Sequence, residues 1–159
     1  MGIVTSLAAV AGTLPLAVPA AARALPARSA PAAFSTTRNG VTCTGPAANQ
    51  LTLLRRVTRP GLLASADRLY LQGLMASVVQ GQRWGVPVGA PAAASVGLKN
   101  GWLHRTTRGW RIHSMGWVRL RTTTSDVVIL SDGNRSLSGG IQRLDTVARA
   151  VHAALGHRR

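Results

Sequence analysis

The chain has 159 residues, of which 46% are hydrophobic, and this predicts one ordinary domain with a buried core. Its formal net charge of +15 would suit nucleic acid, but the arginines are scattered, without a basic block or an aromatic platform beside them, which argues against nucleic-acid binding. Lys99 is the only lysine, and glutamate is absent.

Cysteine and histidine usage argues against a disulfide, a metal centre or a cofactor. Cys43 is the only cysteine, so neither an internal disulfide nor a multi-cysteine metal site can form. The histidines also lack a spacing that would place two of them on one helical face as metal ligands; even His152 and His157 are five positions apart. We therefore expect no bound metal and no cofactor.

Residues 1–33 are rich in alanine and proline and differ from the rest of the chain. An apolar run begins at Ile3, is interrupted by Gly12 and Pro15, and is too short for a bilayer, which needs roughly 20 apolar residues. A secretory signal would have a basic residue before the apolar run, and this chain has none there. Two interpretations stay open, a weak export signal and an extension without its own core, and the folded domain is expected to span residues 34–159.

Two short helices are predicted next. Apolar residues recur every three or four positions between Pro46 and Val57, and this helix should end before Pro60. Ser65 is the predicted N-cap of a second helix that should stop at Gly81. The apolar stripe of that helix is expected to comprise Leu71, Leu74, Met75, Val78 and Val79.

The hydrophobic period then changes from that of a helix to that of strands. Val96 and Leu98 alternate with polar or small residues, residues 110–118 repeat the pattern, and residues 127–130 are continuously apolar. Short loops between the three runs predict an antiparallel meander. A last helix, with Ile141 to Leu155 along its apolar face, should pack on this meander. The predicted fold class is therefore α+β, with two helices, a three-stranded meander and a C-terminal helix.

Two interpretations fit the stretch Lys99-Asn100-Gly101-Trp102. An Asn-Gly pair is typical of a tight hairpin turn, which would make Lys99 an ordinary turn residue. The alternative is a binding site at the end of a strand, where the lysine ammonium creates a positive potential, Asn100 hydrogen-bonds a carboxylate and Gly101 lets a ligand approach the backbone. The runs that flank this stretch favour the second interpretation.

Those runs carry a resemblance to a known family. They are residues 82–86 (QRWGV) before the lysine, residues 109–110 and 114–118 after it, the strand at residues 127–130, and Gly140-Ile141 at the start of the last helix. Together they resemble the C-terminal half of actinobacterial serine hydrolases of the β-lactamase and penicillin-binding type, over about residues 34–157. The resemblance implies a partial β-lactamase/transpeptidase-like fold. It also implies action on a small-molecule β-lactam or a peptidoglycan peptide through an acyl-enzyme.

The family signature has a Ser-x-x-Lys nucleophile, a Ser-Asp-Asn element and a Lys-Thr/Ser-Gly triplet. Only the triplet is matched, by Lys99-Asn100-Gly101, and Asn100 replaces the usual hydroxyl. By the same analogy the backbone N–H of Trp102 would be an oxyanion-hole donor. The candidate substrate-binding residues are therefore Lys99, Asn100, Gly101 and Trp102.

No catalytic residue is predicted. The residue three positions before Lys99 is Val96, and the serines at positions 35 and 65 are followed three positions later by arginine, whose pKa is too high for a base. Ser125-Asp126 and Ser131-Asp132 are interpreted as turn residues at strand ends. We also expect His113 to be a packed or hydrogen-bonded residue rather than a base.

The chain is therefore expected to be a truncated serine hydrolase domain that is inactive alone. The alternatives are a non-catalytic module that binds a carboxylate or a cell-wall peptide, and a basic nucleic-acid-binding domain. The third strand should lack a neighbour, so the N-terminal segment or a partner chain completes the sheet, or the chain is a remnant. The resemblance and the weak signal favour a secreted or cell-envelope location, with the cytoplasm as the alternative.

Overall fold

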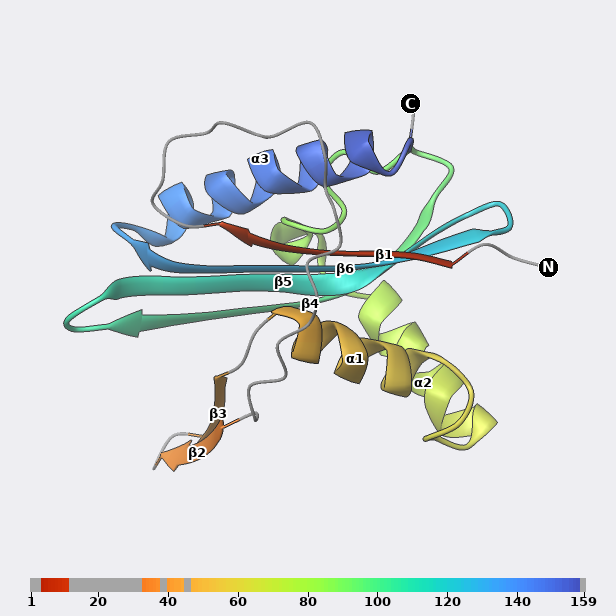
Figure 1. The fold of residues 1–159 in the computed structure, drawn as a ribbon, viewed down its shortest axis with the longest axis horizontal. Coiled ribbons are helices and arrows are strands. Elements are labelled where there is room, and N and C mark those ends of the chain that lie inside the picture. The colour runs from red at the N-terminus through yellow and green to blue at the C-terminus, as the bar shows by residue number, and fades with distance from the viewer. Residues whose placement is uncertain (1–3, 12–32, 38–39, 45–46, 158–159) are drawn as a thin grey trace.

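In the computed structural model, the described backbone comprises residues 4–11, 33–37, 40–44 and 47–157, and side chains are described for residues 47–157. The expected export signal or extension at residues 1–33 lies mostly outside these residues. The fold consists of a sheet between two helical layers, together with a separate hairpin of β2 (Ala33–Thr37) and β3 (Gly40–Thr44) (Figure 1).

The main sheet contains the predicted meander. Strands β4 (Ser95–Arg105), β5 (Gly109–Leu120) and β6 (Thr123–Asn134) pair in antiparallel fashion, in the order β6-β5-β4. Strand β1 (Val4–Ala11) lies parallel to the outer side of β6. The third strand of the meander therefore has a neighbour, which is supplied by the N-terminal segment, the first of the three alternatives.

Helices α1 (Ala47–Thr58) and α2 (Ser65–Ala76) form one layer. The prediction for α2 was wrong at both ends. Ala64 is the N-cap, with no side-chain cap, and the Ser65 hydroxyl instead accepts a bond from Arg68 at 3.3 Å. The helix ends before Ser77, whose N–H donates to Gly73 O, and the chain continues into the 3-10 turn η1 (Gln80–Gln82).

Because α2 ends early, only part of its predicted apolar stripe is buried. Met75 is buried, whereas Leu74 is 51% exposed and Val79, beyond the helix, is 65% exposed. Helix α3 (Leu137–Ala154) likewise begins four residues before the Ile141 expected from periodicity. Ser136 caps it by accepting a hydrogen bond from Gly139 N at 3.0 Å, a signal that the apolar periodicity does not contain.

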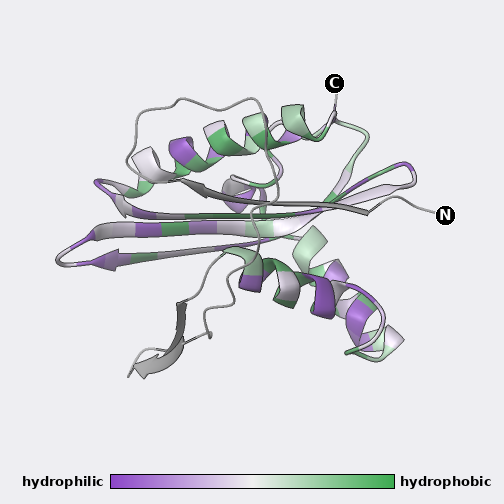
Figure 2. Cartoon of the chain, in the orientation of Figure 1, coloured by the Kyte–Doolittle hydropathy of each residue, from purple (hydrophilic) through white to green (hydrophobic). Residues whose placement is uncertain are grey.

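The two helical layers cover opposite faces of the sheet. Alternate residues of β4, β5 and β6, among them Leu98, Ile112 and Ile129, pack with Leu144 and Ala148 of α3. The intervening residues Trp117 and Val128 pack with Leu54 of α1 and Met75 of α2. Figure 2 shows the same arrangement as hydropathy, with a hydrophobic middle of β6 and alternating residues along β5.

The α1–α2 layer covers only part of its face. In Figure 1 the hairpin of β4 and β5 extends well beyond α1 at the end that carries the connecting turn. The side chains that lie on this face near the turn are therefore free of a helical cover within the described part of the chain. Across the described residues, no helix combines the length and the apolar character that a membrane span requires.

Candidate functional site

Lys99 lies in the middle of β4, directly opposite Met115 of β5. The turn interpretation of Lys99-Asn100-Gly101 was therefore wrong, because the β4–β5 turn falls at residues 106–108 instead. The expected position of these residues at the end of a strand was wrong for the same reason, since β4 continues to Arg105. The Lys99 side chain is exposed, and its Nζ donates a hydrogen bond to Asn100 O at 2.7 Å. Because side chains alternate along a strand, Lys99 shares the face of Trp117 and Met115, the face that α1 and α2 cover only in part.

Asn100 points to the opposite face and has a structural role there. Its Nδ2 donates to Gln82 O at 2.8 Å and to Trp84 O at 3.2 Å, so it fixes residues 82–84 beside β4. Both N–H groups of the amide are used in this way. That Asn100 binds a ligand carboxylate therefore stays a prediction.

Gly101 and Trp102 differ in how closely they are packed. A Cβ at Gly101 would meet no atom within 4 Å, so the space on its face is open. Trp102 is 43% exposed and lies on the Asn100 side of β4, where its ring contacts the ring of Trp84 at a centroid distance of 6.0 Å. Lys99 and Gly101 are thus the members of the predicted set that share the open face.

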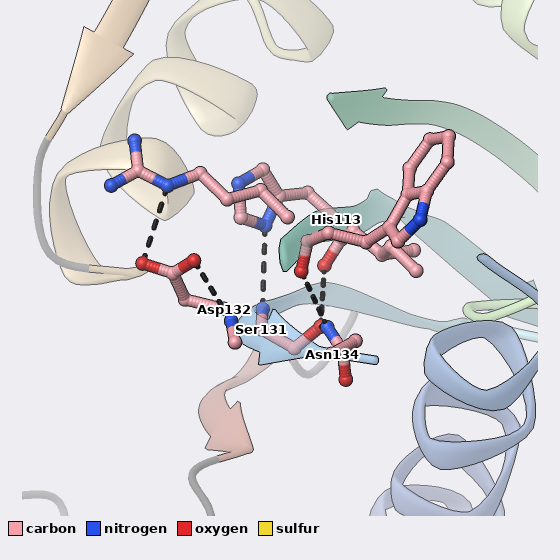
Figure 3. A network of polar contacts seen from close by, with 8 residues as sticks. His113, Ser131, Asp132 and Asn134 are labelled. Atoms are coloured by element: carbon pink, nitrogen blue, oxygen red, sulfur yellow. Dashed lines mark hydrogen bonds and ion pairs between the residues drawn. The ribbon is translucent and has the colours of Figure 1, made fainter. Parts of the chain in front are cut away.

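His113 of β5 lies opposite Gly101 and, because side chains alternate along a strand, on the same face as Lys99. Figure 3 shows its ring beside Ser131 of β6. Its Nδ1 accepts a hydrogen bond from Ser131 N at 3.3 Å, so the neutral ring carries its hydrogen on Nε2. Burial lowers the pKa of His113 below 6.5, an effect that the Arg111 guanidinium reinforces, while the Ile112 backbone and Asp132 oppose it. The expectation that His113 is packed and hydrogen-bonded is confirmed.

Arg111 adds a second cation to this face, because it lies two residues before His113 on β5 and side chains alternate along a strand. Its Nε lies 3.2 Å from Asp132 Oδ2. The sequence analysis did not single out Arg111, although the two-residue period of β5 already places it on the face of His113 and Met115. With Lys99 and Arg111 against Asp132, the open half of this face has a net positive charge, which suits an anionic ligand.

The serine-aspartate pairs that were interpreted as turn residues lie inside β6 instead. Ser125 and Ser131 are buried on the α3 face, where Ser125 contacts His157 and Ser131 donates to Ile112 O. Asp126 is buried on the other face and pairs with Arg59. None of these serines lies on the face of Lys99, and the described residues contain no cluster of three or more potential metal ligands.

No protein-family model and no curated protein matches the chain. Solved structures do match it. One is a variant of the class A β-lactamase of the last common ancestor of Gram-negative bacteria, with 24% identity over 74% of this chain and 42% of that one and a TM-score of 0.59. The unmodified ancestral protein gives 23% identity over 71% and 42% of the two chains, with a TM-score of 0.58.

A third match is PenP from Rhodopseudomonas palustris, assigned to the class A β-lactamases, with 22% identity over 70% of this chain and 41% of that one and a TM-score of 0.55. The chain therefore has the fold of part of a class A β-lactamase, as the resemblance implied. It spans about two fifths of the length of these structures.

Proposed function

We propose that the chain is the sheet-bearing part of a β-lactamase-like serine hydrolase and that it binds the carboxylate of a β-lactam or a peptidoglycan peptide beside Lys99. The observation that carries the proposal is the position of Lys99. The only lysine of the sequence is exposed at mid-strand, on the open half of a sheet face, in a fold shared with class A β-lactamases. A secreted or cell-envelope location is part of the proposal, because peptidoglycan lies there.

The open face offers two groups that can donate to a carboxylate. Lys99 Nζ uses one donor on Asn100 O and has two more, and a charge-assisted hydrogen bond to a carboxylate is about twice as strong as a neutral one. His113 presents its Nε2–H because Nδ1 accepts from Ser131 N. The open space at Gly101, opposite His113, leaves room for the ligand on this face of the sheet.

We propose that this chain alone binds its ligand without cleaving a bond. Acyl transfer needs a nucleophile within hydrogen-bond reach of a base. Among the sheet serines whose side chains are described, Ser114, Ser125 and Ser131 are buried and hydrogen-bonded on the α3 side, and the exposed Ser95 at the start of β4 makes no hydrogen bond to a basic side chain. A non-catalytic module that holds a carboxylate-bearing cell-wall peptide is the second candidate, and this placement of the serines supports it.

The test is equilibrium binding of a fluorescent penicillin and of a peptidoglycan stem peptide, measured by polarisation. Lys99→Ala should weaken binding at least tenfold, whereas Arg56→Ala, which removes an exposed cation on α1, should leave it unchanged. Equal loss in both variants would mean that only overall charge matters. DNA retention that falls steeply with salt and survives Lys99→Ala would instead establish the nucleic-acid alternative.

A further inference from the structure

Two buried histidines meet where the chain turns after α3. His157 N donates to His152 O at 3.0 Å and Gly156 N donates to Ala153 O at 3.1 Å, and Gly156 has φ +70°. This pattern is a Schellman motif, in which the residues at the positions of His152 and His157 usually make an apolar contact. Here their Nδ1 atoms lie 2.9 Å apart, so a hydrogen bond between two imidazoles replaces that contact.

The hydrogen-bond partners determine where the protons lie. His152 Nε2 is 2.8 Å from Val86 O, which can only accept, so that nitrogen carries a hydrogen and Nδ1 of the neutral ring accepts. His157 must then donate from Nδ1, and its Nε2 accepts from the Ser125 hydroxyl at 3.2 Å. One pair of neutral tautomers therefore satisfies every polar atom in this chain of contacts.

We propose that the His152–His157 pair is an acid-operated latch that, with both rings neutral, fastens the turn after α3 to β6 and to Val86. A first proton converts His157 Nε2 from an acceptor into a donor, so the Ser125 hydroxyl has to turn to accept this N–H, and its own hydrogen loses the acceptor that the neutral ring supplied. A second proton sets two N–H groups against each other at Nδ1. Both events take place in a buried site, since His152 is 1% exposed, His157 is 9% exposed and Ser125 is fully buried.

In the part of the chain that the structure describes, the other charged groups near the latch already have a partner or face away. On α3, Asp145 accepts a hydrogen bond from Gly85 N at 2.7 Å, and Arg149 is exposed beside Gly89. On β6, Asp126 follows Ser125 but faces the α1 side, where Arg59 pairs with it. The sequence of β1 contains no titratable side chain. Among the described residues, the nearest titratable partner of each histidine is therefore the other histidine, and burial together with His152 lowers the pKa of His157.

The latch can be tested on the full chain without any ligand. Histidine ring signals in NMR should show that the pKa of His157 lies below 6.5. Hydrogen exchange should show that the amides of Gly156 and His157, which donate to α3 carbonyls, lose protection at least tenfold between pH 7.5 and pH 5, after correction for intrinsic exchange rates. Equal protection of these amides at both pH values would overturn the proposal.

Variants separate the latch from a passive contact. His157→Gln should remove the acid-dependent loss of protection at Gly156, and His104→Gln, an exposed histidine on β4, should leave it intact. If His157→Gln kept the same acid dependence as the parent chain, the latch would be wrong. If that variant does not fold, the wild-type NMR titration decides alone, since an ordinary His157 titration would contradict the proposal.

Discussion

The indole ring of Trp117 lies directly against the backbone of Gly97, its partner on the neighbouring strand. A Cβ at Gly97 would come within 2.6 Å of Trp117 Nε1, closer than real Cβ contacts allow. The small residue at position 97 therefore lets Trp117 cover the sheet between β4 and α1, a few residues from Lys99.

Gly97→Ala should lower the free energy of unfolding by about 1–3 kcal/mol, because overpacking forces the ring or the strand to move. Gly101→Ala is the matched control on the same face, since a Cβ there meets nothing within 4 Å, and it should change stability by about 0.5 kcal/mol or less. Urea unfolding followed by circular dichroism measures both. Equal effects of the two variants would contradict this account of the packing.

Asp126 should contribute much more to stability than Asp132, although both are aspartates of β6 paired with arginines. The Asp126 side chain is 1% exposed and pairs with Arg59 and Arg55, whereas that of Asp132 is 42% exposed. Asp126→Asn leaves the arginines without a buried counter-charge and should lower the free energy of unfolding by about 2 kcal/mol. This effect is smaller than for a fully buried ion pair because both arginines are partly exposed. Asp132→Asn should cost less than about 1 kcal/mol. The same unfolding experiment compares them, and a larger effect at Asp132 would refute the assignment.

Asn100 should stabilise the fold mainly by holding residues 82–84 beside β4. Asn100→Asp replaces the donor to Gln82 O and Trp84 O by a carboxylate oxygen, which repels both carbonyls. Asn100→Asp should lower the free energy of unfolding by about 2 kcal/mol or more. Asn100→Ala, which only removes the hydrogen bonds, should lower it by about 1–2 kcal/mol. Because Trp84 contacts Trp102, both variants should also alter tryptophan fluorescence. Unchanged stability in Asn100→Asp would show that the amide is not needed there.

Acid should destabilise the fold through His113 as well as through the latch. Because the pKa of His113 is lowered in the folded state, the unfolded chain binds more protons below pH 6.5, so stability falls as the pH drops from 6.5 through the folded-state pKa. His113→Asn keeps an acceptor near the position of Nδ1 but does not titrate, and should flatten part of this decline. Thermal unfolding between pH 7.5 and pH 5 measures it, and an identical pH profile in the variant would contradict the assignment.

The strands could be predicted from the sequence because burial on one or both faces leaves a clear record in apolar residues. The apolar residues Val96 and Leu98 alternate with polar or small residues, and residues 127–130 are all apolar. The strands that contain them pair as expected. The ends of helices were missed because caps depend on local backbone geometry. Ser136 caps α3 from a segment without apolar periodicity, and Ala64 replaces the expected Ser65.

The candidate site was only half predictable for a similar reason. Local turn chemistry at Asn100-Gly101 favoured a hairpin, but pairing along the whole of β4 and β5 placed the turn further on. The spacing of His152 and His157 excludes a shared helical face, yet the left-handed Gly156 reverses the chain and brings the rings together. Such contacts depend on a turn type that hydropathy does not record.

The proposed function requires that this chain binds a carboxylate ligand at Lys99 and is not acylated by it. Intact-mass spectrometry of the folded chain after incubation with a fluorescent penicillin, with polarisation of the same sample and a heat-unfolded control, tests both parts at once. We expect reversible binding that Lys99→Ala weakens at least tenfold, with an unchanged protein mass. A covalent adduct on a serine of the folded chain, or binding that is indifferent to Lys99→Ala, would contradict it.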